Sequence, residues 1–259
     1  QGSMNNSVSD SYKETYVAQG NTLISNSNSD NDQNTWGHSI SMRLDHKFSD
    51  NTSLMIQPQF NFGGGDYMQR SISDTWRNEI SDENQTNKNW TLNSGVNKNL
   101  TFSGRGILRQ RLGMPGRTLS LNFNWNIRDN RMNGYNQSLT NTYMMGKVNS
   151  DPVNQRIDQV QKSQTLGASL VYTEPLGNNF YVEGRYQINW SNSLTDKKAY
   201  DSGTYTSPAW PGAIRDIDAI MVYNPADEKL NDLYSNNVVS KNLNQTIGLA
   251  FMYQEDWIR

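Results

Sequence analysis

The chain has 259 residues, and its 23 basic and 25 acidic side chains give a formal net charge of −2, a balance that provides no general attraction to nucleic acid. It contains no cysteine, which excludes disulfides and thiolate metal sites. The chain is polar, with a mean hydropathy of −0.83 and 35 asparagines, yet its 7 Trp, 13 Tyr and 7 Phe argue against disorder. These features fit an architecture in which each element has only one apolar face.

The region before Trp36 shows no long alternating pattern, and we interpret it as loop, although segments 16–18 and 22–24 leave room for the outer half of an extra strand. No run approaches the ~18 apolar residues of a membrane-spanning helix. The chain does not open on a signal peptide either. We therefore expect it to be a piece cut from a longer protein.

From Trp36 to Phe48 every second residue is bulky, and the residues between are small or polar. Successive side chains of a strand point to opposite faces, so this pattern predicts a strand over 36–48 with one apolar and one polar face. The same alternation predicts strands over 53–62, 100–112, 118–128, 165–173, 180–190 and 244–254. No segment of comparable length has a helical period, so the pattern indicates an all-β protein.

The connections between these strands alternate in length. Short turns over 49–52, 113–116 and 174–179 are separated by long stretches over 63–89, 129–164 and 191–243, which we expect to be loops. Membrane barrels show this alternation, with short periplasmic turns and long extracellular loops, whereas a β-sandwich has no reason to collect every long loop at one end. The chain 1–259 is therefore predicted to form part of an antiparallel up-and-down transmembrane β-barrel wall, about seven to eight strands of a larger barrel.

The length of the apolar faces agrees with a membrane. Phe180 and Trp190 are ten residues apart on one face, which spans roughly 24 Å at ~3.3 Å per residue and a tilt near 45°, close to the ~25 Å apolar band of such barrels. Aromatic residues gather at both membrane interfaces of such proteins. The interface candidates are Trp36, Phe48, Trp125, Phe180, Trp190 and Tyr253.

One hairpin resembles a known family. The segment Leu170-Val171-Tyr172-Thr173-Glu174-Pro175-Leu176-Gly177-Asn178-Asn179-Phe180 is similar to the tyrosine-threonine-glutamate-proline-leucine hairpin of the outer-membrane protein β-barrel family related to TonB-dependent receptors. The segment 116–123 looks like another hairpin of that family, and 51–54 fits its first turn. The resemblance implies a barrel domain of a large Gram-negative envelope protein with a plug and a small β-sandwich elsewhere in the parent chain, and it carries no catalytic residues.

The sequence gives little support for a metal or catalytic site. His38 and His46 share a face but lie roughly 27 Å apart along a strand, so they cannot share an ion and are expected to be interface rings. The run Asp30-Asn31-Asp32 lacks the glycine and terminal glutamate of a calcium loop. No serine has a histidine placed to act as its base, and Gly63-Gly64-Gly65 is expected to be a flexible loop entry. We predict no enzyme, metal or cofactor.

The predicted polar faces carry an excess of cations that would line the barrel lumen. Seven cations stand against two acids on these inward positions, a net charge of +5: Arg43, Lys47, Arg105, Arg109, Arg111, Arg128 and Arg185, with Asp45 and Glu183. Such charges either pair with strands of the parent chain that are absent from this sequence, or face an acidic plug or an anionic solute.

The predicted function is that of an outer-membrane receptor or transporter segment that takes part in solute uptake or ligand binding at the cell surface of a Gram-negative bacterium. Its expected partners are outer-membrane lipid, the remaining barrel strands and plug, and a solute, with no nucleic acid. Two alternatives stay open. One is a structural or assembly barrel without transport, and the other is a secreted β-sandwich that binds glycans.

Overall fold

The computed structural model describes residues 2–17, 20–177, 179–202, 210–219 and 223–253. Residues 178 and 254, which belong to the expected turn 174–179 and the expected last strand, lie outside this part. The elements in chain order are β1 (Gly2–Tyr16), β2 (Thr22–Ser41), β3 (Leu44–Lys47), β4 (Thr52–Arg77), η2 (Asp82–Asn84), β5 (Gln85–Arg111), β6 (Thr118–Met144), β7 (Lys147–Pro175), β8 (Phe180–Ser202), η3 (Ile214–Ala219), η4 (Pro225–Asp227), β9 (Glu228–Leu230) and β10 (Asn236–Tyr253).

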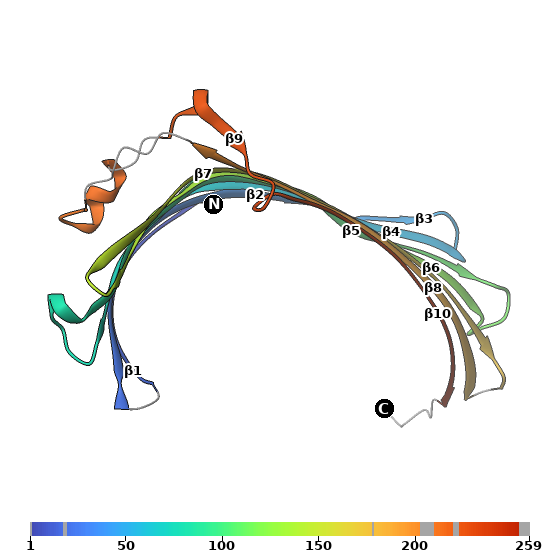
Figure 1. Cartoon of the computed structure of the whole chain (residues 1–259). Helices are drawn as coiled ribbons and strands as arrows, with labels where there is room; N and C mark the ends of the chain where they lie inside the picture. The colour runs from blue at the N-terminus through green and yellow to red at the C-terminus, as the bar shows by residue number, and fades with distance from the viewer. Residues whose placement is uncertain (1, 18–19, 178, 203–209, 220–222, 254–259) are drawn as a thin grey trace.

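The strands form one antiparallel sheet of ten strands in the order β1-β2-β4-β5-β6-β7-β8-β10, with β3 paired to β4 and β9 paired to β8. Figure 1 shows this sheet end-on as a deep arch whose two edge strands, β1 and β10, do not meet. The prediction of an all-β, up-and-down antiparallel architecture is confirmed. The described residues provide no second sheet to pack against the first, as a sandwich would require.

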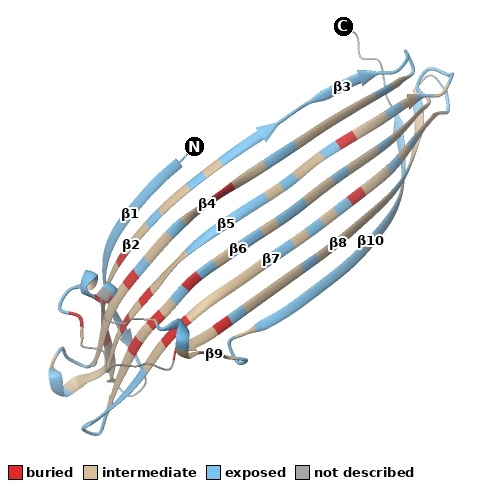
Figure 2. Cartoon of the chain, turned by 90° about the horizontal axis from the view of Figure 1, so that it is seen from above, coloured by how far each residue is buried: buried red, intermediate tan, exposed pale blue. Residues whose placement is uncertain are grey.

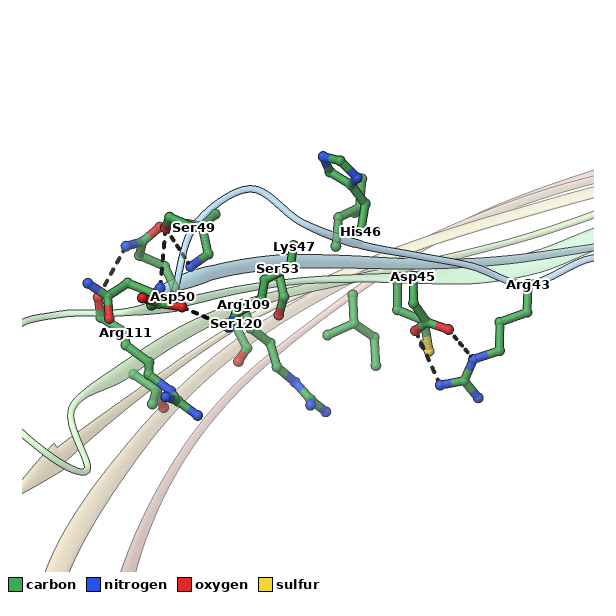
Figure 3. A pocket seen from close by; sticks show the side chains of 17 residues that line it. Arg43, Asp45, His46, Lys47, Ser49, Asp50, Ser53, Arg109, Arg111 and Ser120 are labelled. Atoms are coloured by element: carbon green, nitrogen blue, oxygen red, sulfur yellow. Dashed lines mark hydrogen bonds and ion pairs between the residues drawn. The ribbon is translucent and has the colours of Figure 1, made fainter.

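Strand register places the apolar positions of all the predicted strands on one face. Residues directly opposite each other in a sheet share a face, and these pairs connect from strand to strand without a shift in the central part of the sheet. One such row is Leu54, Leu108, Leu121, Leu170, Tyr186 and Ile247. This row lies on the convex, outer face of the arch, together with His46, which Figure 3 shows on the side opposite to Arg109 and Arg111.

The stretches expected to be long loops are mostly strand, and this prediction is wrong. β4 continues to Arg77, β5 begins at Gln85, and β6 and β7 are joined by only Met145 and Gly146, whose φ angles of 49° and 74° suit a tight two-residue hairpin turn. Only the connection between β8 and β10 remains long. Apolar alternation marks a strand that has one apolar face, whereas polar and charged residues interrupt the apolar positions in the outer halves of these strands, where the apolar residues gather in a cluster around Trp90, Leu92 and Leu139.

The region before Trp36 is also strand, not loop. β1 pairs along its whole length with the outer half of β2, from Gly2 opposite Trp36 to Tyr16 opposite Thr22.

The expected strand 36–48 is instead interrupted between Ser41 and Leu44. Pro58 of β4 accepts a hydrogen bond from the Met42 amide at 3.0 Å but has no N–H to return one, which weakens the ladder at this point.

Glycines in the strands make room for aromatic rings or for close backbones. Gly104 and Gly106 of β5 lie under the rings of Trp125 and Phe123, because a Cβ atom at either glycine would lie within 2.3 Å and 2.0 Å of them. The run Gly63–Gly65, expected to be a loop entry, lies in the middle of β4. A Cβ at Gly65 would come within 2.2 Å of the Asn34 carbonyl oxygen, so these glycines permit close approach of β2 and β4.

The long connection between β8 and β10 folds back onto the convex face. Residues 210–219, which we call the strap, lie outside the arch in Figure 1 and contact β2, β4 and β5. Ile217 of the strap is fully buried in a cluster with Trp90, Leu92 and Leu139, and Lys88 lies 4.4 Å above the ring of Trp210. Figure 2 shows that most buried positions gather at this outer end of the sheet.

No helix in the described part of the chain is both long and apolar enough to cross a membrane.

Candidate functional site

A hollow of about 630 Å³ lies on the concave face, near the short turns that join β3 to β4 and β5 to β6. Four cationic side chains line it: Arg43, Lys47, Arg109 and Arg111. Hydroxyl groups also line the hollow, from Ser49, Thr52, Ser53, Thr118 and Ser120. We call this hollow the basic pocket (Figure 3).

Strand geometry brings these residues together from distant parts of the sequence. Arg109 and Arg111 share a face of β5 because they are two residues apart. Register then sets Arg109 directly opposite both Ser53 of β4 and Ser120 of β6, and Lys47 of β3 directly opposite Ser53. In Figure 3 the side chains of Arg43, Asp45, Arg109 and Arg111 all extend to the same side of the ribbon.

The pocket has positive charges that the described residues do not neutralise. Arg43 pairs with Asp45 at 2.6 Å and Lys47 with Asp50 at 2.8 Å. The side chains of Arg109 and Arg111 are exposed, and their guanidinium groups have no hydrogen-bond or ion-pair partner within the described ranges; Arg111 forms hydrogen bonds only through its backbone, as when its carbonyl accepts from the Gln110 side chain at 3.1 Å. Four cations against the two acids leave a net charge of +2 in the lining. Guanidinium groups bind carboxylates and phosphates through paired hydrogen bonds, so this arrangement suits an anionic group.

The other predicted lumen residues share the concave face but lie outside the basic pocket. Arg105 donates to the Gln57 side chain at 2.7 Å. Arg185 pairs with Glu183 at 3.1 Å and belongs to the same cross-sheet row as Arg109, two strands beyond β6. Arg128 lies further along β6, opposite Thr101. The structure thus groups Arg43, Asp45, Lys47, Arg109 and Arg111, and leaves the other four apart.

The aromatic interface candidates occupy both ends of the apolar stretch. At the end with the short turns, the ring centroids of Phe180 and Tyr253 are 4.8 Å apart, and those of Phe48 and His46 are 4.5 Å apart. Trp36 of β2 and Trp190 of β8 lie toward the other end, and Trp125 stacks on Phe123. His38 stacks on Phe62 at 5.2 Å. The described residues contain no group of three or more side chains suited to a metal.

The sequence analysis did not predict the ion pairs of the outer half. The buried Arg70 donates to Asp218 of the strap at 2.6 and 2.7 Å and to Asp32 at 2.8 Å, while Arg215 of the strap donates to the buried Asp30 at 2.8 Å. The carboxylates considered for calcium therefore bind arginines. Asp30 and Asp32 lie an even number of residues from Trp36 on β2, so all three side chains share the convex face. Extending the alternation backward from Trp36 would have placed the two carboxylates there.

A second outer cluster fixes the return of the long connection to the sheet. Arg156 of β7 donates to Glu228 of β9 at 2.8 and 3.1 Å, and Tyr223 donates to the same carboxylate at 2.7 Å. The hydrogen bonds from Arg156 lower the pKa of Glu228, and burial together with Glu228 raises the pKa of Tyr223. The carboxylate therefore stays ionised at neutral pH and holds β9 at the outer end of β8.

We expect the double variant Arg109→Gln/Arg111→Gln to bind inorganic pyrophosphate more weakly, by about tenfold for each arginine, because each charge-assisted hydrogen bond contributes about 1.5 kcal/mol or more. Isothermal titration of the intact protein in detergent at low salt measures the dissociation constant. The matched control is Arg105→Gln/Arg128→Gln, which removes the same charge from the same face outside the pocket. Equal weakening by both pairs would show that only the general charge of the face attracts the anion.

No protein-family model, curated protein or solved structure matches the chain.

Proposed function

We propose that the chain forms part of the wall of an outer-membrane β-barrel in a Gram-negative bacterium, within a receptor or transporter related to the TonB-dependent receptors. In this role it takes part in solute uptake or ligand binding at the cell surface and catalyses no reaction. One observation carries the proposal: a single curved antiparallel sheet has a continuous, uncovered apolar face opposite a polar one.

The exposure of that apolar face is the main support. Ile247, Leu249 and Phe251 of β10 are 83%, 67% and 75% exposed, and apolar residues of β4 to β8 continue the same surface. Soluble proteins rarely expose contiguous apolar patches larger than a few hundred Å². Lipid hydrocarbon covers such a surface in membrane barrels, whose outer face is an apolar band and whose interior is polar.

Strand lengths favour a barrel that projects beyond the membrane. The strands β4 to β7 have 26 to 29 residues, whereas about 9–11 residues suffice to cross a bilayer. The apolar convex stretch occupies only the half nearest the short turns. The other half carries many polar and charged residues, and the strap covers its convex apolar cluster of Trp90, Leu92 and Leu139, so we assign it to the aqueous side.

The two open edges support a place within a larger barrel. The edge strands β1 and β10 each have one side without a partner strand in the described part, and such bare edges pair readily with other strands. β1 and β10 run in opposite directions, so further antiparallel strands from the parent chain can continue the sheet from both. A plug or a passing solute would then face the basic pocket.

A structural barrel that anchors partners without transport is the competing function. It predicts a concave face filled by close-packed side chains. The basic pocket of about 630 Å³ and the exposed Arg109 and Arg111 favour a face that meets a solute or a plug.

The proposal is tested by fractionating the envelope of cells that make the intact protein and by comparing its gel mobility with and without boiling. We expect recovery in the outer membrane and a folded band that shifts on boiling, since membrane barrels resist detergent until heated. Recovery as a detergent-free soluble monomer without a shift would overturn the proposal, because the apolar face would then be covered by protein.

A further inference from the structure

A second hollow, of about 390 Å³, lies on the concave face across the middle of β5, β6 and β7. Two neighbouring cross-strand rows form its floor: one is Asn97, Met132 and Gln159, and the next is Asn99, Asn130 and Gln161. The two other lining residues, Lys98 and Arg131, alternate with these along their strands and belong to the convex face. We call the six concave residues the amide grid.

The five amides of the grid are free to bind a ligand. Their side chains have no hydrogen-bond partner within the described part of the chain, and all except the half-buried Gln159 are exposed. Elsewhere on this face an amide does find a partner, as Asn89 donates to the Thr140 hydroxyl at 2.7 Å. Each carboxamide offers two donors and an acceptor oxygen, and a hydroxyl group can both donate and accept. The grid therefore suits a ligand with many hydroxyl groups.

An aromatic ring lies beside the grid and is held against the sheet. Tyr67 of β4 is directly opposite Gly95 of β5, which is opposite Gly134 of β6. A Cβ atom at Gly95 or Gly134 would lie 3.0 or 3.2 Å from the Tyr67 hydroxyl, which donates to the Met132 sulfur at 3.6 Å. The ring thus lies along the sheet over β5, in a place that only glycine leaves open. The apolar face of a sugar ring can pack on such a surface.

Two cations flank the grid without acidic partners. Arg128 lies two residues before Asn130 on β6, and Lys197 of β8 is directly opposite Gln159. Neither side chain has a hydrogen-bond or ion-pair partner among the described residues. The concave positions around the grid, within 59–71, 91–101, 126–136, 155–165 and 191–199, carry no acidic side chain. The surroundings of the grid therefore favour a ligand that brings its own negative charges.

We propose that the amide grid binds an acidic oligosaccharide, an inference that rests on the proposed function and names the class of its solute. The sugar hydroxyls meet the amides, one ring packs on Tyr67, and carboxylates pair with Arg128 and Lys197. These two cations are two strands and four residues apart, roughly 16 Å. One anionic group cannot reach both, whereas a chain of a few sugars can. Arg109 of the basic pocket is ten residues from Asn99, roughly 33 Å along β5, so the grid is a separate site.

The test is isothermal titration of the intact protein in detergent at low salt, with trigalacturonic acid and its fully methyl-esterified form as the two probes. The unmodified protein is expected to bind the acid at least tenfold more tightly than the ester. The variant Asn130→Leu/Gln159→Leu is expected to weaken binding of both probes by about fivefold for each amide removed. The matched control Asn122→Leu/Gln187→Leu removes the same groups from another row of the concave face and should bind both probes as the unmodified protein does.

The variant Arg128→Gln/Lys197→Gln tests the charges separately, because it keeps every amide. It is expected to bind the acid and the ester alike, whereas Arg109→Gln/Arg111→Gln is expected to keep the preference for the acid. Absence of trigalacturonate binding would overturn the inference. Equal losses in the two leucine variants, or a preference retained without Arg128 and Lys197, would also overturn it.

The heat shift of each preparation is recorded in parallel, so that a variant with altered binding is known to be folded. Loss of the shift in the unmodified protein would contradict the proposed membrane barrel itself. A normal shift without trigalacturonate binding would contradict only the role of the amide grid.

Discussion

Replacing Leu121 by arginine is expected to lower the free energy of unfolding in lipid vesicles by about 2–4 kcal/mol, the cost of a cation on the lipid face near the middle of a bilayer. Leu121 lies on the convex face, 39% exposed, between Leu108 of β5 and Leu170 of β7. No acidic side chain of that cross-strand row can pair with the new guanidinium. Urea titration of the intact protein in phosphatidylcholine vesicles, followed by tryptophan fluorescence, measures the difference.

The control for this experiment is Asn122→Arg. Asn122 is the next residue of β6 and lies on the concave face, opposite Ile107 and Ser169, where water would solvate the charge. We expect a change smaller than about 0.5 kcal/mol, as for most surface substitutions. Similar losses for the two variants would mean that the two faces meet the same medium, which contradicts a membrane barrel.

Ile217→Ala is expected to destabilise the docking of the strap by about 2–5 kcal/mol, the range for truncating a fully buried isoleucine. Ile217 is 0% exposed between the strap and the cluster of Trp90, Leu92 and Leu139. The ion pairs of the strap, Arg215 with Asp30 and Asp218 with Arg70, remain, but exposed parts of such pairs contribute little once the apolar contact is lost. Hydrogen–deuterium exchange of peptides covering 210–219 measures the release.

Leu233→Ala is the matched control, because Leu233 belongs to the same long connection and is 92% exposed. It removes an aliphatic side chain that packs against nothing in the described structure, so the exchange of 210–219 should not change. If Ile217→Ala also left the exchange unchanged, the strap would be held by its ion pairs and not by the buried cluster.

The sequence predicted the half of the sheet that has an apolar face. Alternation from Trp36, Leu54, Leu100, Leu119 and Phe180 places strands correctly because each bulky residue there occupies the convex face. The outer halves, including β1, follow no apolar pattern. Their strands form because backbone hydrogen bonding continues along an established pairing, while polar and charged side chains interrupt the apolar positions and the strap covers the apolar residues Trp90, Leu92 and Leu139.

The candidate site depended even more on tertiary structure. The alternation of side chains within a strand predicted that Arg109 and Arg111 share the polar face. It also predicted that Lys47 lies on the polar face of its own strand. It could not predict that Lys47 and Arg109 would flank Ser53, or that Lys98 would lie opposite Arg131, because these neighbours depend on the register between strands. Turn lengths and the continuous ladder determine that register, and neither is contained in the alternation of a single segment.

By itself, therefore, the sequence determined that the protein is an all-β chain with one apolar and one polar face in each of seven strands, since side-chain alternation is a local property of extended backbone. The tertiary structure decided how far the strands extend, where β1 pairs, and which charges become neighbours. It also decided that residues 210–219 return to the convex face, because Ile217 gains burial only where Trp90, Leu92 and Leu139 meet across strands. Such contacts join residues far apart in the chain, and only the folded sheet brings them together.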